Sequence, residues 1–183
     1  YIVYAKKQCQ FILDNDYQVT SDDLIQGRAG IIILLLLMYK TTQDKMYLDI
    51  AQKVGTNLVE SIQSKNCLAG MAHGYSGMAV AMALLGKYTG EVNYKEIVLE
   101  LCRKEDLLFD YSMNNWCDIR EGKENPRNTV AWCHGSAGIL LARALIHKIS
   151  GLSINQLFKD IPLNQVTDQI CQTEKTDWCL CHG

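Results

Sequence analysis

Three stretches of the chain are almost wholly apolar, and each follows two glycines spaced three residues apart. They read IIILLLLMY after Gly27–Gly30, MAVAMALLG after Gly74–Gly77 and ILLARALIH after Gly135–Gly138. A helix that is apolar on nearly all sides is stable only when other elements surround it. The pattern therefore predicts three inner, buried helices, each entered through a tight glycine turn.

More polar, amphipathic segments lie between these stretches. They cover Lys45 to Ser64, Tyr94 to Cys102 and Pro162 to Cys171, and we expect each to form an outer helix. Strand patterns are weak, and neither proline interrupts a helical pattern. The sequence therefore predicts an all-α fold in which inner and outer helices alternate as hairpins.

The glycine motifs also define a repeat. Their first glycines are residues 27, 74, 135 and 183, so the intervals are 47, 61 and 48 residues. A period of this size is typical of stacked helical units, here an α/α toroid or solenoid of which three to four hairpins are present. The longer middle interval contains a polar segment, Asp110 to Asn128, with Trp116, Asp118 and Arg120. Such insertions usually lie on one face, often the binding face.

Composition narrows the function classes. A length of 183 residues suits one domain, and a net charge of −2 without a Lys/Arg run gives no footprint for nucleic acid. The longest apolar run, Ile31 to Met38, is far shorter than the roughly 20 residues needed to cross a bilayer. The chain begins at Tyr1 and stops directly after a helix-starting glycine motif. We therefore expect residues 1–183 to be a single partial domain, truncated at both ends.

The eight cysteines favour reduced thiols over a disulfide scaffold, because the chain has abundant core residues and no secretion signal. This predicts a cytoplasmic protein. Cys9, Cys102 and Cys171 lie among apolar neighbours in helical patterns. We expect them to be small buried core residues.

Three of the four histidines directly precede the first glycine of a motif: His73, His134 and His182. The fourth, His147, lies late in an apolar helix and is interpreted as a structural histidine. If the repeats stack around an axis, the starts of the inner helices converge at one end of it. Residues far apart in the sequence would then meet there.

Cys133, Cys181 and His182 supply the three ligands of a catalytic zinc site with one open position. Gly183 would allow the turn that two adjacent ligands need. Cys179 is a rival ligand, and a closed site with four ligands would be structural instead. The spacing leaves these alternatives open.

The motifs resemble those of the lanthionine synthetase C-like cyclases. The matching segments are Ala72 to Gly77, Trp132 to Ile139 and Cys181 to Gly183, and Asp23 to Gly30 resembles an earlier repeat motif of the family. Trp116-Cys117-Asp118-Ile119-Arg120 ahead of Trp-Cys-His-Gly is most similar to the C-terminal cyclase domain of bifunctional class II lanthipeptide synthetases.

The resemblance implies a toroid of seven hairpins around a zinc ion held by Cys133, Cys181 and His182. It also implies a lanthipeptide-forming enzyme that adds cysteine thiols to dehydroalanine or dehydrobutyrine. His73 would be its acid/base residue and Asp23 the nearby carboxylate. Its partners would be a dehydrated precursor peptide and a dehydratase domain upstream in the same chain.

Some positions are less certain matches to that family. An arginine of the family matches either Arg120 or Arg127. His134 stands where stand-alone cyclases commonly have tyrosine. From the residues alone, Asp23 is also a candidate N-cap, because Ser21-Asp22-Asp23 precedes an apolar run.

Two other functions fit the predicted architecture. An α/α-toroid glycoside hydrolase would need paired carboxylates, whereas the helix starts here offer cysteine and histidine, with Asp23 as their acid. A non-catalytic scaffold of the same fold would bind zinc or thiols only structurally.

Overall fold

The computed structural model describes residues 2–14, 19–122, 124–173 and 181, and this part of the chain is mainly helical. The prediction of an all-α fold is confirmed. The elements are α1 (Ile2–Asp14), α2 (Arg28–Thr42), α3 (Lys45–Ser64), α4 (Tyr75–Thr89), α5 (Asn93–Asp106), β1 (Phe109–Asp110), β2 (Asn115–Trp116), α6 (Ser136–Ser150), α7 (Ile154–Leu157) and α8 (Leu163–Gln172).

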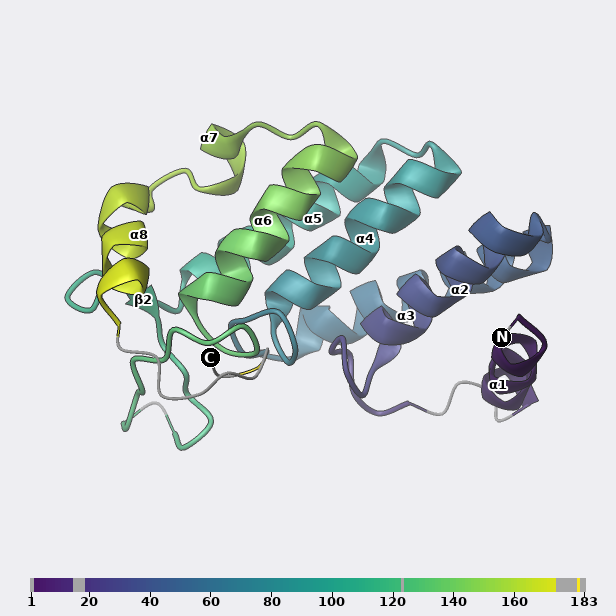
Figure 1. The fold of residues 1–183 in the computed structure, drawn as a ribbon, viewed down its shortest axis with the longest axis horizontal. Helices are drawn as coiled ribbons and strands as arrows, with labels where there is room; N and C mark the ends of the chain where they lie inside the picture. Colours follow the sequence, from purple (N-terminus) through teal and green to yellow (C-terminus); the bar gives the residue numbers. More distant parts are fainter. Residues whose placement is uncertain (1, 15–18, 123, 174–180, 182–183) are drawn as a thin grey trace.

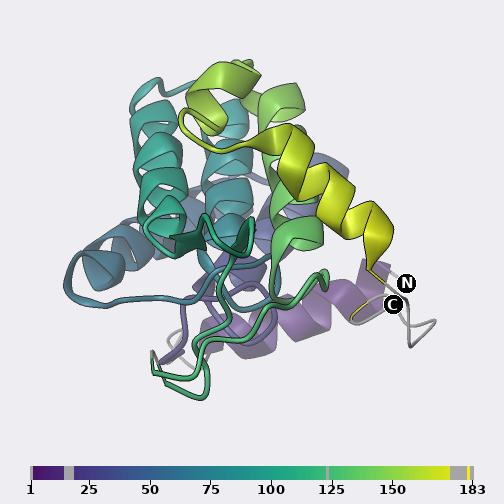
Figure 2. The ribbon, with the colours of Figure 1, turned by 90° about the vertical axis from the view of Figure 1, so that its left-hand side faces the viewer.

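The inner helices α2, α4 and α6 lie side by side, and α3 and α5 pack against them as outer partners (Figures 1 and 2). The predicted outer helices are found at α3, α5 and α8. The loops that precede α4 and α6 gather at one end of the array (Figure 1). The alternation of inner and outer helices therefore places the three glycine motifs, and the residues before them, near one another.

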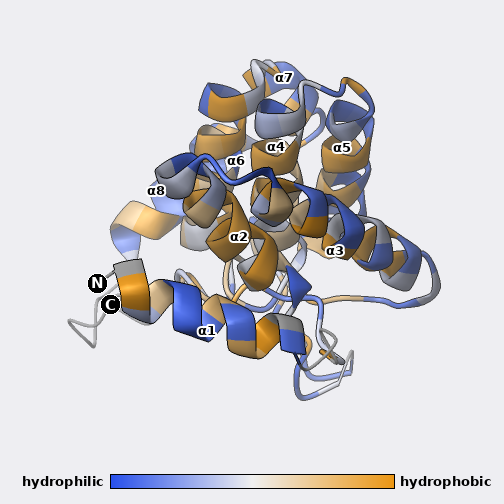
Figure 3. Cartoon of the chain, turned by 90° about the vertical axis from the view of Figure 1, so that its right-hand side faces the viewer, coloured by the Kyte–Doolittle hydropathy of each residue, from blue (hydrophilic) through white to orange (hydrophobic). Residues whose placement is uncertain are grey.

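Burial follows the predicted pattern of apolar and amphipathic helices. Helix α4 lies between α2 and α6, and most of its residues are buried. Helix α3 buries one stripe, which includes Tyr47, Val54 and Leu58, and exposes its polar face. Figure 3 shows this contrast, with hydrophobic colour dominating α2 and α4 and alternating colours along α3. Leu37 on α2 and Leu141 on α6 remain exposed, so these two inner helices are less covered than α4.

The second glycine of each motif has a packing function that repeats in all three units. A Cβ atom added at Gly30, Gly77 or Gly138 would lie under 3.0 Å from a main-chain carbonyl oxygen six residues earlier, in Leu24, Met71 and Trp132 respectively. The chain before each inner helix therefore folds back onto the first turn of that helix. Only glycine allows this approach, so the motif is explained by backbone packing.

Two features differ from the expectations. A short antiparallel ribbon, β1 with β2, opens the inserted segment, although strand signals there were weak. Helix α8 is at the edge of the array and leaves Cys171 exposed, so the prediction that this cysteine is buried was wrong. Cys9 and Cys102 are buried as expected. None of the described helices is long and apolar enough to cross a membrane.

Replacing Gly77 with alanine should lower the free energy of unfolding by about 1–3 kcal/mol, because the new methyl group overlaps the carbonyl of Met71. Thermal unfolding of Gly77→Ala would measure this. Gly90→Asn is the control. Gly90 ends α4 in the left-handed region, which asparagine tolerates, and a Cβ atom added there would have no other atom within 4 Å. Equal melting of Gly77→Ala and wild type would contradict the packing explanation.

Candidate active site

The three loops before the inner helices are hydrogen-bonded to one another through the peptide groups of Ala72. The Leu24 N–H donates to the Ala72 carbonyl at 3.1 Å, and the Ala72 N–H donates to the Cys133 carbonyl at 3.3 Å. The loop that carries His73 thus lies between the loop with Asp23 and the loop with Cys133. The convergence expected from the repeat is present for these three residues.

His73 and Asp23 form a close pair. The His73 Nδ1 lies 3.1 Å from the Asp23 Oδ2, and the other carboxylate oxygen accepts the Gln26 N–H at 2.6 Å. Burial alone would raise the pKa of Asp23, but hydrogen bonds from Gln26 and His73 outweigh it, so this pKa lies below its ordinary value. The N-cap of α2 is Gly27, so Asp23 does not cap that helix.

His134 stacks on His73. Their ring centroids are 5.3 Å apart and their planes differ by 17°. His134 is buried and lies near Asp118, whose carboxylate forms a bidentate pair with the Arg120 guanidinium. Burial by itself would raise the pKa of Asp118. The hydrogen bonds from Arg120 and the charge of neighbouring Arg120 and His134 outweigh this effect, so the pKa of Asp118 lies below its ordinary value. Two imidazoles, a carboxylate and a guanidinium therefore meet beside Cys133.

A cavity of about 470 Å³ opens onto these groups, and Asp23, His73, Arg120 and His134 all line it. Arg120 is thus the arginine that the structure brings to the site. Arg127 forms an ion pair with Glu121 instead and is not among the residues that line this cavity.

Asp22 fixes the segment that carries Asp23. Its carboxylate forms an ion pair with Arg28, accepts the Ser61 hydroxyl at 2.7 Å and lies 3.8 Å from the Lys65 Nζ. These partners hold the first loop against α3. Although Asp22 also lines the cavity, its two oxygens are engaged by α2 and α3.

Cys133 and Cys181 lie together. The Cys133 thiol donates to the Cys181 carbonyl at 3.2 Å, and both residues pack with Ala72 and Ala131. Burial and the neighbouring Cys181 thiol raise the pKa of Cys133 to about 11. Two thiols held side by side are a donor set that suits zinc, because a coordinating thiol is deprotonated by the cation.

The rest of the predicted zinc shell is not covered by the structure. His182 and the rival ligand Cys179 lie outside the described residues. Within the described ranges, no group of three or more histidine, cysteine or acidic side chains is arranged to hold a metal. His147 Nδ1 donates to the Leu152 carbonyl at 2.7 Å, just beyond the end of α6, as expected for a structural histidine.

Sequence reasoning missed three buried polar residues that support these loops: Glu105, Asn115 and Arg143. Arg143 had a visible signal, because it is the one charged residue in the apolar stretch ILLARALIH. A charge in such a helix requires a buried partner. Glu105 had no such signal, since an acidic residue near the end of an amphipathic helix is normally exposed.

The protein is thus an all-α array of helical hairpins. A His–Asp pair and two thiols lie together at the starts of its inner helices. Residues 2–183 match the family described as lanthionine synthetase C-like protein. The chain belongs to this family.

One curated relative supports this assignment. The chain is 32% identical over 188 residues to the lacticin 481/lactococcin biosynthesis protein LcnDR2 of Lactococcus lactis subsp. lactis. This alignment covers 98% of the chain and 19% of the relative. The chain therefore spans about a fifth of the length of that relative.

The lowered pKa of Asp23 predicts a pH-dependent contribution to stability. Because the folded-state pKa is below the unfolded value of about 3.9, the stabilisation is complete well above pH 4 and disappears as pH falls through the folded pKa. Asp23→Asn should therefore unfold more easily than wild type at pH 7, by on the order of 1 kcal/mol. Denaturant titrations at several pH values would show the two proteins converging in acid, and a constant difference would contradict the assignment.

Proposed function

We propose that the protein is a zinc-dependent peptide cyclase that adds cysteine thiols to dehydroalanine or dehydrobutyrine and forms the (methyl)lanthionine rings of a lanthipeptide. The observation that carries this proposal is the placement of the His73–Asp23 pair beside Cys133 and Cys181, on loops joined through Ala72. Family membership and a relative named for lacticin 481/lactococcin biosynthesis support it.

Thioether formation needs a thiolate, and a free cysteine thiol with a pKa of about 8.5 is mostly protonated at neutral pH. Cys133, Cys181 and His182 would hold the zinc, which when bound supplies a charge that favours the thiolate of a substrate cysteine at its open position. The pair is suited to this function because Cys133 is buried and the partly buried Cys181 already packs against it.

His73 would act as the general acid/base residue of the addition. The substrate sulfur forms a bond to the β-carbon, and the C=C π electrons move toward the α-carbon and its carbonyl to give an enolate. A proton then bonds to the α-carbon, so the net reaction adds S and H across the double bond. Asp23 holds Nδ1 of His73, which orients the ring and leaves Nε2 for proton transfer. The His73 side chain is 32% exposed, so substrate can reach it.

Arg120 is placed to assist the same step. It lines the cavity with His73, and Asp118 holds its guanidinium. A fixed cation near the substrate carbonyl would stabilise the negative charge that develops on its oxygen. We therefore propose Arg120, in preference to Arg127, as the arginine of the site.

The proposed substrate is a dehydrated precursor peptide in the cytoplasm. Since the relative is much longer than this chain, we also propose that a dehydratase domain precedes this region in the complete protein. A glycoside hydrolase mechanism fits less well, because Asp22 is engaged by Arg28 and Ser61 while Asp23 is paired with His73.

Cys133→Ala should abolish zinc binding and ring formation together, because it removes one of two adjoining thiols. Metal analysis and mass spectrometry of the peptide after thiol labelling would measure both effects. Cys117→Ala is the control, since Cys117 is a buried thiol of the inserted segment and should keep both properties. Ring formation by a metal-free Cys133→Ala protein would rule out the mechanism.

His73→Ala should retain zinc but slow cyclisation by about 10²–10⁴-fold, the usual contribution of an acid/base residue. His147→Ala is the matched control because that histidine contacts the Leu152 carbonyl at the far end of α6. Loss of metal from His73→Ala would show that His73 belongs to the zinc shell instead.

A further inference from the structure

A single buried carboxylate holds both ends of the loop that carries His73. Glu105, near the end of α5, is fully buried. Its Oε1 accepts the Gly70 N–H at 3.0 Å and the Ser76 N–H at 3.1 Å, and its Oε2 accepts the Ser76 hydroxyl at 2.7 Å. Gly70 and Ser76 lie on either side of His73 in the sequence. The position of this loop therefore depends on one side chain from another helix.

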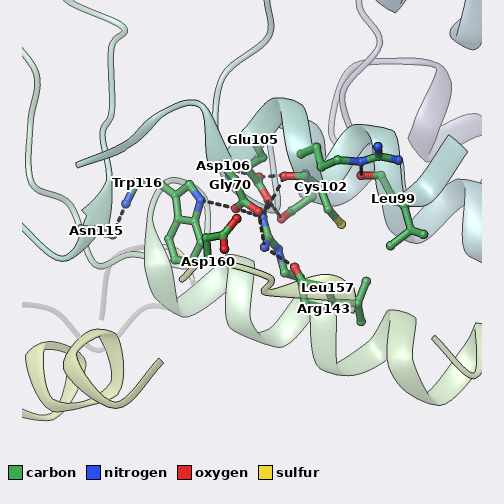
Figure 4. A network of polar contacts seen from close by, with 12 residues as sticks. Gly70, Leu99, Cys102, Glu105, Asp106, Asn115, Trp116, Arg143, Leu157 and Asp160 are labelled. Atoms are coloured by element: carbon green, nitrogen blue, oxygen red, sulfur yellow. Dashed lines mark hydrogen bonds and ion pairs between the residues drawn. The ribbon is translucent and has the colours of Figure 1, made fainter. Parts of the chain in front are cut away.

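Arg143 balances the charge of Glu105. It extends from α6, is fully buried, and donates to Glu105 at 3.1 Å and to Asp106 at 2.6 Å (Figure 4). Its guanidinium also lies over the rings of Trp116 and Phe158, with centroids 5.2 and 4.8 Å away. A buried carboxylate without such a partner would be strongly destabilising. Arg143 thus offsets part of the cost of burying the Glu105 carboxylate.

Asn115 holds the next loop in a similar way. Its Oδ1 accepts the Ser136 N–H at 3.1 Å, and its Nδ2 donates to the Thr129 carbonyl at 2.9 Å. Thr129 and Ser136 lie on either side of Cys133. The neighbouring Trp116 indole donates to Asp106 at 3.0 Å, which joins this contact to the Arg143 network (Figure 4).

These hydrogen bonds fix the positions of the loops more than they stabilise the packing of the helices. A buried ion pair contributes little net stability compared with apolar residues of the same size, but it favours one arrangement of the groups that it bonds. The groups bonded to Oε1 of Glu105 are both main-chain N–H groups that flank His73: that of Gly70 in the loop and that of Ser76 in the first turn of α4. Ala72, within that loop, is in turn bonded to Leu24 and Cys133. A shift of this loop would therefore move His73 relative to both Asp23 and the thiols.

We propose that Glu105 is a positioning residue: its carboxylate fixes the Gly70–Ser76 loop so that His73 faces Asp23 and the Cys133–Cys181 pair. The consequence for catalysis rests on the proposed cyclase function, whereas the effect on the loop does not. Neither Glu105 nor Arg143 lines the cavity, so they act through the loop and not on the substrate.

The test compares two double variants that both remove the buried charges. Glu105→Gln/Arg143→Met keeps one side-chain carbonyl oxygen that can accept the two N–H groups, and Glu105→Met/Arg143→Met keeps none. At a temperature where both are folded, the Met/Met variant should show a kcat about 100-fold below that of the Gln/Met variant, as expected for a displaced catalytic group. Zinc content and KM for the dehydrated peptide should stay close to those of the Gln/Met variant.

Hydrogen exchange gives a second measurement that does not require activity. The amides of residues 70–76 should exchange faster in the Met/Met variant than in the Gln/Met variant, while those of α3 stay equal. Equal exchange in this loop, or equal kcat per folded molecule, would overturn the proposal. If the wild-type protein forms no rings, the cyclase function fails, but the exchange comparison still decides whether Glu105 holds the loop.

A smaller change keeps the test possible if the Met/Met variant does not fold. Ser76→Ala removes only the hydroxyl that bonds to Glu105, and it should lower kcat severalfold and speed exchange in the same loop. Ser136→Ala is the matched control at the start of α6, where the hydroxyl makes no hydrogen bond within the described part of the chain. Identical behaviour of the two serine variants would count against the proposal.

Discussion

The two hydrogen bonds of the Ala72 peptide groups are the contacts on which the candidate site depends. They join the loop before α4 to the loops before α2 and α6, so residues 23, 73 and 133 have fixed relative positions. The glycines make this possible, because the second glycine of each motif lets the chain pack directly on the first turn of an inner helix. A repeated backbone contact thus creates a common edge where different side chains are brought together.

The polar network beneath this edge explains how the loops are kept in place. Inner helices packed only by leucine, alanine and methionine could slide or rotate at modest cost, since such contacts have little directional preference. Glu105 and Asn115 add directional bonds to the main chain on both sides of His73 and Cys133. Arg143 supplies the compensating charge for Glu105 from α6. The core therefore combines apolar packing for stability with a few buried polar contacts that select one arrangement of the loops.

The site itself combines two kinds of environment. Asp23 and His73 border a cavity with partly exposed side chains, whereas Cys133 is buried and packs against Cys181. Burial opposes ionisation of the Cys133 thiol and raises its pKa, whereas hydrogen bonds lower the pKa of Asp23. The joined loops therefore place a buried thiol and a His–Asp pair that borders the cavity in one site.

The sequence by itself determined the helical class, the limits of the outer helix α3, the three inner helices and the glycine motifs that precede them, because these follow from the local order of apolar and polar residues. It also indicated that His73 and Cys133 would converge, since a repeat places equivalent positions at one end of an array, and the family resemblance implied that Asp23 lies near His73. It did not show that Asp23 faces His73 instead of capping α2, that Arg120 and not Arg127 enters the cavity, or that Cys171 is exposed. Nor did it show that Glu105 and Arg143 form a buried pair. Only the tertiary structure decided these points, because each depends on which side chain of a distant segment forms the contact. The order of apolar and polar residues along one segment carries no information about that distant side chain.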